Sequence, residues 1–223
     1  MTESSFWSRV VAQYPLFADT LVPGPGATPV TLEDVSTPEF VRAAIAEGQK
    51  IFSIEQGKFA GQLWFYTFCN AMVAPSVYAM VEFDKVPSLD LSKGSLHAVD
   101  DFWFGHSPDT FLEEGDYRTA GEQYGAAVAP IIATLCEVTD LRPAPLWAVA
   151  GDCMAIAAMQ AGEEAFEEEL AQEVAIALIS GLSTAASVPT PRFTEGGKLR
   201  RASCCMIYHS PRADMCTSCP HLP

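Results

Sequence analysis

Four cysteines near the C-terminus have the types and spacing to bind metal. Cys204 and Cys205 are adjacent, and Cys216 and Cys219 follow in the pattern C-C-x10-C-x2-C. Four thiolates are the ligand set of an iron–sulfur cluster or of a structural zinc site. The C-x2-C turn can direct both of its sulfurs to one metal ion, whereas neighbouring side chains tend to diverge. Diverging ligands suit a binuclear cluster better than a single zinc ion, whose paired ligands usually have two to four residues between them.

The charges around these cysteines fit an anionic centre. Residues 190–223 hold five basic and two acidic side chains, so this segment carries +3 and the other 189 residues carry −18. Basic side chains near a cluster are expected to stabilise its reduced state and raise its potential. They could also dock an acidic electron donor, and a solvated basic loop is the alternative interpretation. The charged residues are Arg192, Lys198, Arg200, Arg201 and Arg212, against Glu195 and Asp214.

The chain as a whole is acidic and apolar. Its 223 residues include 13 Lys and Arg against 28 Asp and Glu, a formal net charge of −15, and 49% of them are hydrophobic. This balance excludes nucleic-acid binding over a broad surface, because phosphate binding needs clustered cations. The apolar fraction argues against disorder. We therefore expect a globular protein with no nucleic-acid partner.

Two segments bear on membranes and targeting. Residues 1–5 contain neither a basic stretch nor the start of an apolar one, so we expect a cytoplasmic location, with peripheral contact at the inner face of a membrane left open. Residues 59–81 carry no charge and are long enough to span a bilayer. Gln62, Asn70 and Pro75 interrupt this run, and no basic cluster flanks it. A buried helix is predicted there, and no transmembrane span.

Apolar periodicity, caps and breakers predict an α+β fold that is mainly helical with a small antiparallel sheet, and the cysteine spacing favours a C-terminal iron–sulfur tail. Residues 86–104 alternate partially and contain a Lys93-Gly94 turn, which indicates a β-hairpin or part of a small sheet. Residues 198–208 are expected to be strand-like. Helices are predicted at 6–14, 37–49, 59–83 with a bend at Pro75, 116–138, 145–160 and 163–180.

The histidines are further candidate groups. His209 and His221 lie beside the four cysteines and are alternative ligands, although the cysteines already complete a ligand set. His97 and His106 flank the aromatic residues 102–104. They could line a substrate pocket, but hydrogen-bonded structural histidines are the favoured interpretation.

The other notable clusters have structural interpretations. An acidic run lacks the Glu-x-x-His motifs of a di-iron bundle site, so it is predicted to be an exposed helix face. Apolar residues at helical spacing supply the buried side of that helix. Three isolated cysteines and three tryptophans are interpreted as core residues, with contact to a bulky ligand as the alternative for the tryptophans. These sets are Glu163, Glu164, Glu167, Glu168 and Glu169; Phe166, Leu170, Val174 and Leu178; Cys69, Cys136 and Cys153; and Trp64, Trp103 and Trp147.

The tail resembles a known family. Its pattern R-x-S-C-C-x10-C-x2-C-P, beginning at Arg201, is similar to the C-terminal signature of the FhuF-like ferric siderophore reductases, and Leu146-Trp147 resembles the middle region of that family. The resemblance implies a single FhuF-like domain over 1–223, whose C-terminal loop and [2Fe-2S]-binding segment is 187–223. It also implies a cytoplasmic oxidoreductase. The cluster ligands would be Cys204, Cys205, Cys216 and Cys219, which could pair on the two irons in any of the possible ways.

The reaction implied by the resemblance follows from coordination chemistry. A siderophore holds Fe(III) through hard oxygen donors that bind Fe(II) far more weakly, so one electron from the cluster would release the iron. No G-x-G-x-x-G fingerprint is present, so an external donor such as a ferredoxin or flavoprotein is expected to supply the electron. Two alternatives stay open. One is a non-enzymatic interaction protein with a structural four-cysteine zinc site, and the other is an iron–sulfur redox sensor.

Overall fold

The computed structural model describes residues 3–100, 102–189, 191–193, 199–216 and 219–220. The α-helices are α1 (Glu3–Gln13), α2 (Ala18–Leu21), α3 (Leu32–Val35), α4 (Pro38–Phe52), α5 (Gly57–Glu82), α6 (Tyr117–Val138), α7 (Pro143–Ala165) and α8 (Glu168–Leu182), with short 3-10 turns η1 (Pro15–Phe17) and η2 (Ile207–His209). The strands are β1 (Thr28–Pro29), β2 (Val86–Pro87), β3 (Ser95–Ala98), β4 (Phe104–Ser107), β5 (Phe111–Leu112), β6 (Arg192–Phe193) and β7 (Leu199–Arg200).

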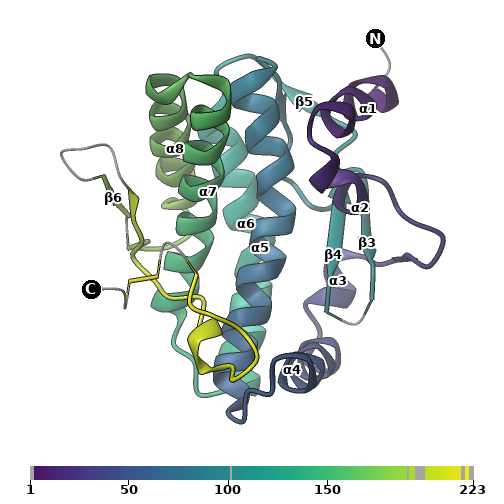
Figure 1. Cartoon of the computed structure of the whole chain (residues 1–223), viewed down its shortest axis with the longest axis vertical. Coiled ribbons are helices and arrows are strands. Elements are labelled where there is room, and N and C mark those ends of the chain that lie inside the picture. The colour runs from purple at the N-terminus through teal and green to yellow at the C-terminus, as the bar shows by residue number, and fades with distance from the viewer. Residues whose placement is uncertain (1–2, 101, 190, 194–198, 217–218, 221–223) are drawn as a thin grey trace.

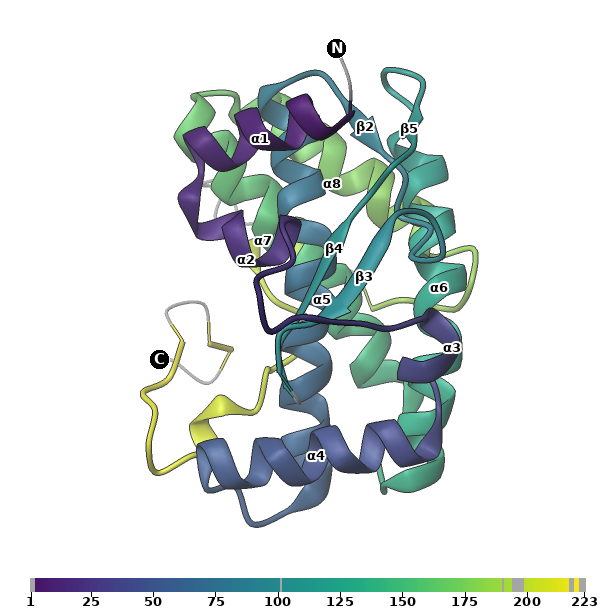
Figure 2. The same ribbon diagram turned by 90° about the vertical axis from the view of Figure 1, so that its right-hand side faces the viewer.

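Helices α5, α6, α7 and α8 form a bundle, and the C-terminal segment lies along one side of it (Figure 1). Helix α5 packs against α7 and α4, and α8 packs against α6 and α7. Helix α4 crosses the lower end of α5, while β3 and β4 run beside the upper part (Figure 2). The predicted fold class, mainly helical with small antiparallel sheets and a cysteine-rich C-terminal region, is confirmed.

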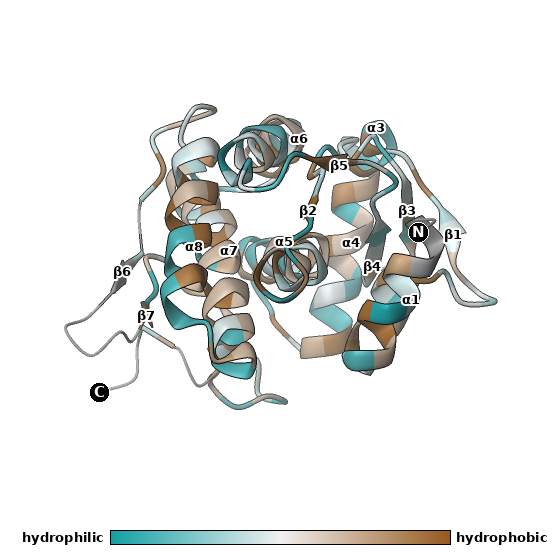
Figure 3. Cartoon of the chain, turned by 90° about the horizontal axis from the view of Figure 1, so that it is seen from above, coloured by the Kyte–Doolittle hydropathy of each residue, from teal (hydrophilic) through white to brown (hydrophobic). Residues whose placement is uncertain are grey.

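Helix α5 is the central element of the bundle (Figure 3). Apolar residues surround its axis, and most of them are buried against the helices and strands on both sides. A helix that is apolar all round belongs either in a protein core or in a membrane. Within the part of the chain that the structure describes, neither α5 nor any other helix reaches the length and apolarity that a membrane span requires. The prediction of a buried helix over 59–81 is therefore confirmed.

The start of α4 follows its predicted signals. Thr37 is the N-cap, and its hydroxyl accepts a hydrogen bond from the Phe40 N–H at 3.3 Å. Pro38 occupies the first helical position, where its missing N–H removes no helical hydrogen bond. The helix continues past the predicted end at residue 49 to Phe52 and is followed by Ser53 in a left-handed conformation.

The small sheets are antiparallel, but their strands pair differently from the prediction. The hairpin of β3 and β4 turns around Asp100, not at Lys93-Gly94. The Asp100 carboxylate accepts the N–H groups of Phe102 and Trp103, both at 2.8 Å, and this local bonding fixes the turn. Strand β1 extends the hairpin on the β3 side, and β2 pairs with β5.

Two further boundaries differ from the prediction. Helix α7 continues through Gly162 to Ala165, so the break before α8 lies at Phe166, which has a left-handed φ of 59°. Phe166 is 92% exposed and does not belong to the buried side of α8, whereas Val174 and Leu178 are fully buried there. The strand-like prediction for 198–208 holds only for β7, because Ser203 and the residues after it bond to the bundle instead of to another strand.

The two histidines of the hairpin are buried structural groups. His97 and His106 are each 1% exposed, and their Nε2 atoms lie 3.0 Å from the carbonyl oxygen of Asp19 and 2.8 Å from that of Lys93. A carbonyl only accepts, so each Nε2 donates. Each Nδ1 has no hydrogen-bond partner among the described residues. Burial lowers the pKa of His106, because its protonation would place an unpaired N–H in the core.

Helices α6 and α8 approach each other most closely at two glycines. A methyl group on Gly121 would lie 2.0 Å from the carbonyl oxygen of Leu178, and one on Gly181 would lie 2.0 Å from that of Arg118. These distances leave no room for a side chain, so the two backbones are in direct contact.

We expect Gly121→Ala to lower the free energy of unfolding by about 2 kcal/mol, because the new methyl group forces the helices apart. Urea denaturation measures this change. Gly24→Ala is the matched control, since a methyl group there meets no atom within 4 Å and should change stability by less than about 0.5 kcal/mol. Equal effects of the two substitutions would contradict the close packing.

The buried His106 predicts an acid-sensitive contribution to stability. Because its pKa is lowered in the folded state, the unfolded chain binds a proton first as the pH falls below about 6.5. The contribution is therefore full above that pH and is lost on acidification. The free energy of unfolding, measured by urea denaturation, should be higher for the wild type than for His106→Gln at about pH 8. This difference should become smaller as the pH falls to about 5.5. A difference that does not change with pH would rule out this contribution.

Candidate metal centre

A buried carboxylate of the bundle holds the start of the cysteine segment, defined here as residues 199–220. Asp152 of α7 is fully buried, and its two oxygens accept the N–H groups of Ala202 at 2.8 Å and Ser203 at 2.7 Å. The Arg201 Nε lies 3.7 Å from the same carboxylate. Burial raises the pKa of Asp152 to about 6, while the two backbone N–H groups and Arg201 act in the opposite direction. The carboxylate is thus mainly ionised at neutral pH.

Helices α4 and α5 provide three more attachments. Gln62 of α5 is 1% exposed and donates its amide N–H to the Cys204 carbonyl oxygen at 2.8 Å. His209 stacks on Phe59, with ring centroids 3.7 Å apart and the planes 6° from parallel. The Ser210 hydroxyl donates to the carbonyl oxygen of Phe52, the last residue of α4, at 2.6 Å. The segment is therefore held on both sides of the cysteine pair.

The chain reverses at Met206, which has a left-handed φ of 67°. Its N–H donates to the Cys204 Sγ at 3.3 Å. The reversal brings Cys205 towards Cys216, and their Sγ atoms are 3.9 Å apart. The Cys219 N–H donates to the Cys216 carbonyl oxygen at 3.0 Å, which closes the C-x2-C turn. Cys204, Cys205 and Cys219 are buried and Cys216 is half-buried.

The two adjacent cysteines differ in acidity. The Cys204 thiol hydrogen-bonds to Cys205, and this bond raises the pKa of Cys204 and lowers that of Cys205 to about 5. Arg201 contributes further to the low pKa of Cys205 through its charge. Burial raises the pKa of Cys216. Of these three cysteines, Cys205 therefore loses its proton most readily, and it is a thiolate at neutral pH.

Arg201 places a buried positive charge against these sulfurs. The residue is 5% exposed, and its Nη1 donates to the Cys216 Sγ at 3.5 Å. The guanidinium carbon lies 4.9 Å from the centre of the Tyr66 ring, a cation–π contact. Nε and Nη2 have no hydrogen-bond partner among the described residues. A buried guanidinium with spare N–H groups suits an anionic neighbour.

The spacing of two of the sulfurs suits a shared metal ion. Two thiolates on one tetrahedral ion, with metal–sulfur bonds of about 2.3 Å, lie about 3.8 Å apart. The 3.9 Å between Cys205 and Cys216 fits one such pair. Among the described residues, no three Cys, His, Asp or Glu side chains gather as a single-ion site. A binuclear cluster divides its four ligands into pairs, so the Cys205–Cys216 pair has a spacing that either kind of centre requires.

Other residues predicted from the sequence lie in varied places. His209 belongs to the cysteine segment and stacks on Phe59 of α5, and His221 lies outside the described residues. The acidic run is exposed as predicted, but Glu163 and Glu164 end α7 instead of starting α8. Trp103 is 43% exposed, which contradicts its interpretation as a core residue. Cys69, Cys153, Trp64 and Trp147 are buried core residues as predicted, and Cys136 is partly buried against the core.

Three residues of the site were not predicted to belong to it. Asp152 had a visible signal, because it is the only charge between Pro143 and Gly162 in an apolar helix. Gln62 is likewise a polar residue in the uncharged run that forms α5. Tyr66 had no such signal, since an aromatic residue in an apolar helix normally packs in a core.

Comparison with known proteins adds one match. Residues 201–221 match the family model described as the FhuF 2Fe-2S C-terminal domain. The match begins at Arg201 and includes all four cysteines, so it confirms the resemblance of the tail. No curated protein matches the chain.

We expect Asp152→Asn to release the start of the cysteine segment. An amide cannot accept both backbone N–H groups, and its loss of charge leaves Arg201 unpaired, at a cost of about 3 kcal/mol. The opening of the segment should become roughly a hundredfold more frequent. Trypsin cleavage at Arg201, followed by mass spectrometry, measures it. Asp140→Asn, at an exposed aspartate, is the control; equal cleavage in both variants would contradict the anchoring role.

Proposed function

We propose that this protein is an iron–sulfur ferric siderophore reductase in which Cys204, Cys205, Cys216 and Cys219 hold a [2Fe-2S] cluster. One electron then passes to Fe(III) in a siderophore, and the weakly bound Fe(II) is released. The observation that carries the proposal is the buried Arg201 against the Cys216 sulfur, within the residues that match the FhuF 2Fe-2S domain. When bound, the cluster supplies reversible one-electron transfer.

Each neighbouring side chain has a defined task in this proposal. Arg201 compensates the negative charge of the thiolates and favours the reduced state of the centre. Asp152 fixes the position of Arg201, and Gln62 holds the carbonyl group of Cys204. These groups are buried, so they exclude water from one side of the sulfurs.

The adjacency of Cys204 and Cys205 supports a binuclear cluster over the zinc alternative, because neighbouring side chains tend to diverge. A structural zinc ion requires all four sulfurs around one point, and its paired ligands usually have two to four residues between them. Cys205 and Cys216 have the spacing of one ligand pair. The electron donor is proposed to be an external ferredoxin or flavoprotein, because the chain has no nucleotide-binding fingerprint. We propose a cytoplasmic location, where such donors and imported siderophores meet.

We expect Cys216→Ser to abolish both cluster binding and iron release. Anaerobically purified wild type should contain about two irons per chain, absorb visible light and give an S = 1/2 signal after dithionite reduction. The variant should lack these properties and reduce a ferric siderophore no faster than dithionite alone does. The measurements are metal analysis, absorption, electron paramagnetic resonance and the rate of Fe(II) capture by a chelator.

Cys136→Ser is the control, because this cysteine lies on α6 outside the cysteine segment and should leave cluster and activity unchanged. A colourless wild type with one zinc ion after cluster reconstitution would replace the reductase by the structural zinc site. A wild type with the cluster but without electron transfer to a ferric siderophore would favour the redox sensor.

A further inference from the structure

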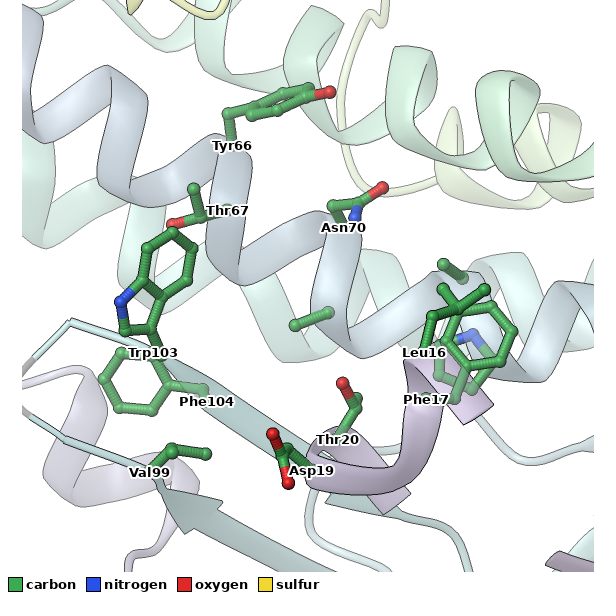
Figure 4. A pocket seen from close by; sticks show the side chains of 13 residues that line it. Leu16, Phe17, Asp19, Thr20, Tyr66, Thr67, Asn70, Val99, Trp103 and Phe104 are labelled. Carbon is green, nitrogen blue, oxygen red and sulfur yellow. The ribbon is translucent and has the colours of Figure 1, made fainter. Parts of the chain in front are cut away.

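A pocket of about 540 Å³ lies beside α5, on the side of the hairpin of β3 and β4. Thr67 and Asn70 of α5 form one wall, and Trp103 and Phe104 face them from the hairpin (Figure 4). The start of α2 adds Asp19 to the lining. Pockets of this volume bind small organic ligands.

The rim of this pocket is unusually apolar for an exposed surface. Trp103 is 43% exposed, Leu16 is 69% exposed and Val99 is 38% exposed, and all three line the pocket. They are three of the eight large hydrophobic side chains that are exposed in the described part of the chain. Apolar side chains that gather around a hollow mark a binding site more often than single ones do.

One residue connects the pocket with the cysteine site. Tyr66 belongs to the pocket lining, and its ring lies 4.9 Å from the guanidinium carbon of Arg201. Arg201 in turn donates to the Cys216 Sγ at 3.5 Å. Figure 4 shows the Tyr66 ring pointing away from the strands that form the opposite wall. Two side chains, Tyr66 and Arg201, thus separate the pocket from a cysteine sulfur.

The lining selects a ligand by charge. It contains the carboxylate of Asp19, the amide of Asn70 and the hydroxyl groups of Thr20 and Thr67, but no Lys or Arg among the described residues. A trianionic ligand would lose its hydration without a cation to pair with it. An uncharged or cationic ligand meets aromatic faces and hydrogen-bonding groups that suit it.

We propose that this pocket binds the ferric chelate and that Tyr66 and Arg201 lie between its iron and the cysteine-held centre. This inference rests on the proposed function. In the reaction, Fe(III) of the chelate gains one electron and becomes Fe(II), and the centre loses that electron. An external one-electron donor restores it. No bond between ligand and chain forms or breaks.

The test measures binding apart from reduction. A gallium(III) chelate has the charge of the ferric one but accepts no electron under these conditions, so calorimetry reports binding alone. The probes are a cationic gallium trihydroxamate and the trianionic gallium tricatecholate. We expect the full-length protein to bind the first and to bind the second much more weakly. Trp103→Ala should raise the Kd for the gallium trihydroxamate about tenfold. The separate variant Asp19→Lys should raise that Kd by a larger factor and lower the Kd for the gallium tricatecholate.

Phe166→Ala is the matched control, because Phe166 is 92% exposed at the end of α7 and should leave both Kd values unchanged. Trp103→Ala should also raise the KM for reduction of the ferric trihydroxamate without changing the cluster spectrum. An unchanged Kd in both pocket variants, or equal binding of both probes, would overturn the proposal. If the pocket variants change the Kd but the wild type does not reduce the ferric chelate, the result would support the pocket as a binding site and reject the reductase function.

Discussion

A carboxylate buried completely in a protein must find its partners there, and Asp152 finds them in the cysteine segment. Removing it from water is costly, and two backbone N–H groups and the Arg201 guanidinium offset that cost. The same contacts fix the backbone just before the cysteine pair and set Arg201 over Tyr66. The geometry around the sulfurs therefore depends on one residue of α7.

Helix α5 is the second element that fixes the position of the cysteine segment. Phe59, Gln62 and Tyr66 are three and four residues apart, so they share a face, and that face meets the cysteine segment. Thr67 and Asn70 lie on the neighbouring face and line the pocket. Helix α5 thus separates the pocket from the sulfurs and sets the distance between them while the cysteine segment is attached.

Much of this arrangement could be predicted from local patterns. The cysteine spacing, the Thr37-Pro38 cap and the apolar run of α5 each depend on neighbours in sequence, and each prediction agrees with the findings. The hairpin pairing was wrong because the Asp100 carboxylate, and not Lys93-Gly94, organises the turn. Phe166 was misplaced because its left-handed backbone ends α7 where the apolar spacing continues. The contacts of Asp152 join residues fifty positions apart, which no local pattern encodes.

The attachments of the cysteine segment differ in kind from those of the bundle. Apolar burial and close helix contacts hold α5 to α8 together, whereas in residues 201–210 hydrogen bonds, an ion pair and a ring stack add to the apolar contacts of Cys205 and Ile207. Polar attachments of this kind open at much lower free energy than a core does. The segment can therefore detach as a hinged flap while the bundle stays folded. For the proposed cluster, loading and removal would then be local events that need no unfolding of the bundle.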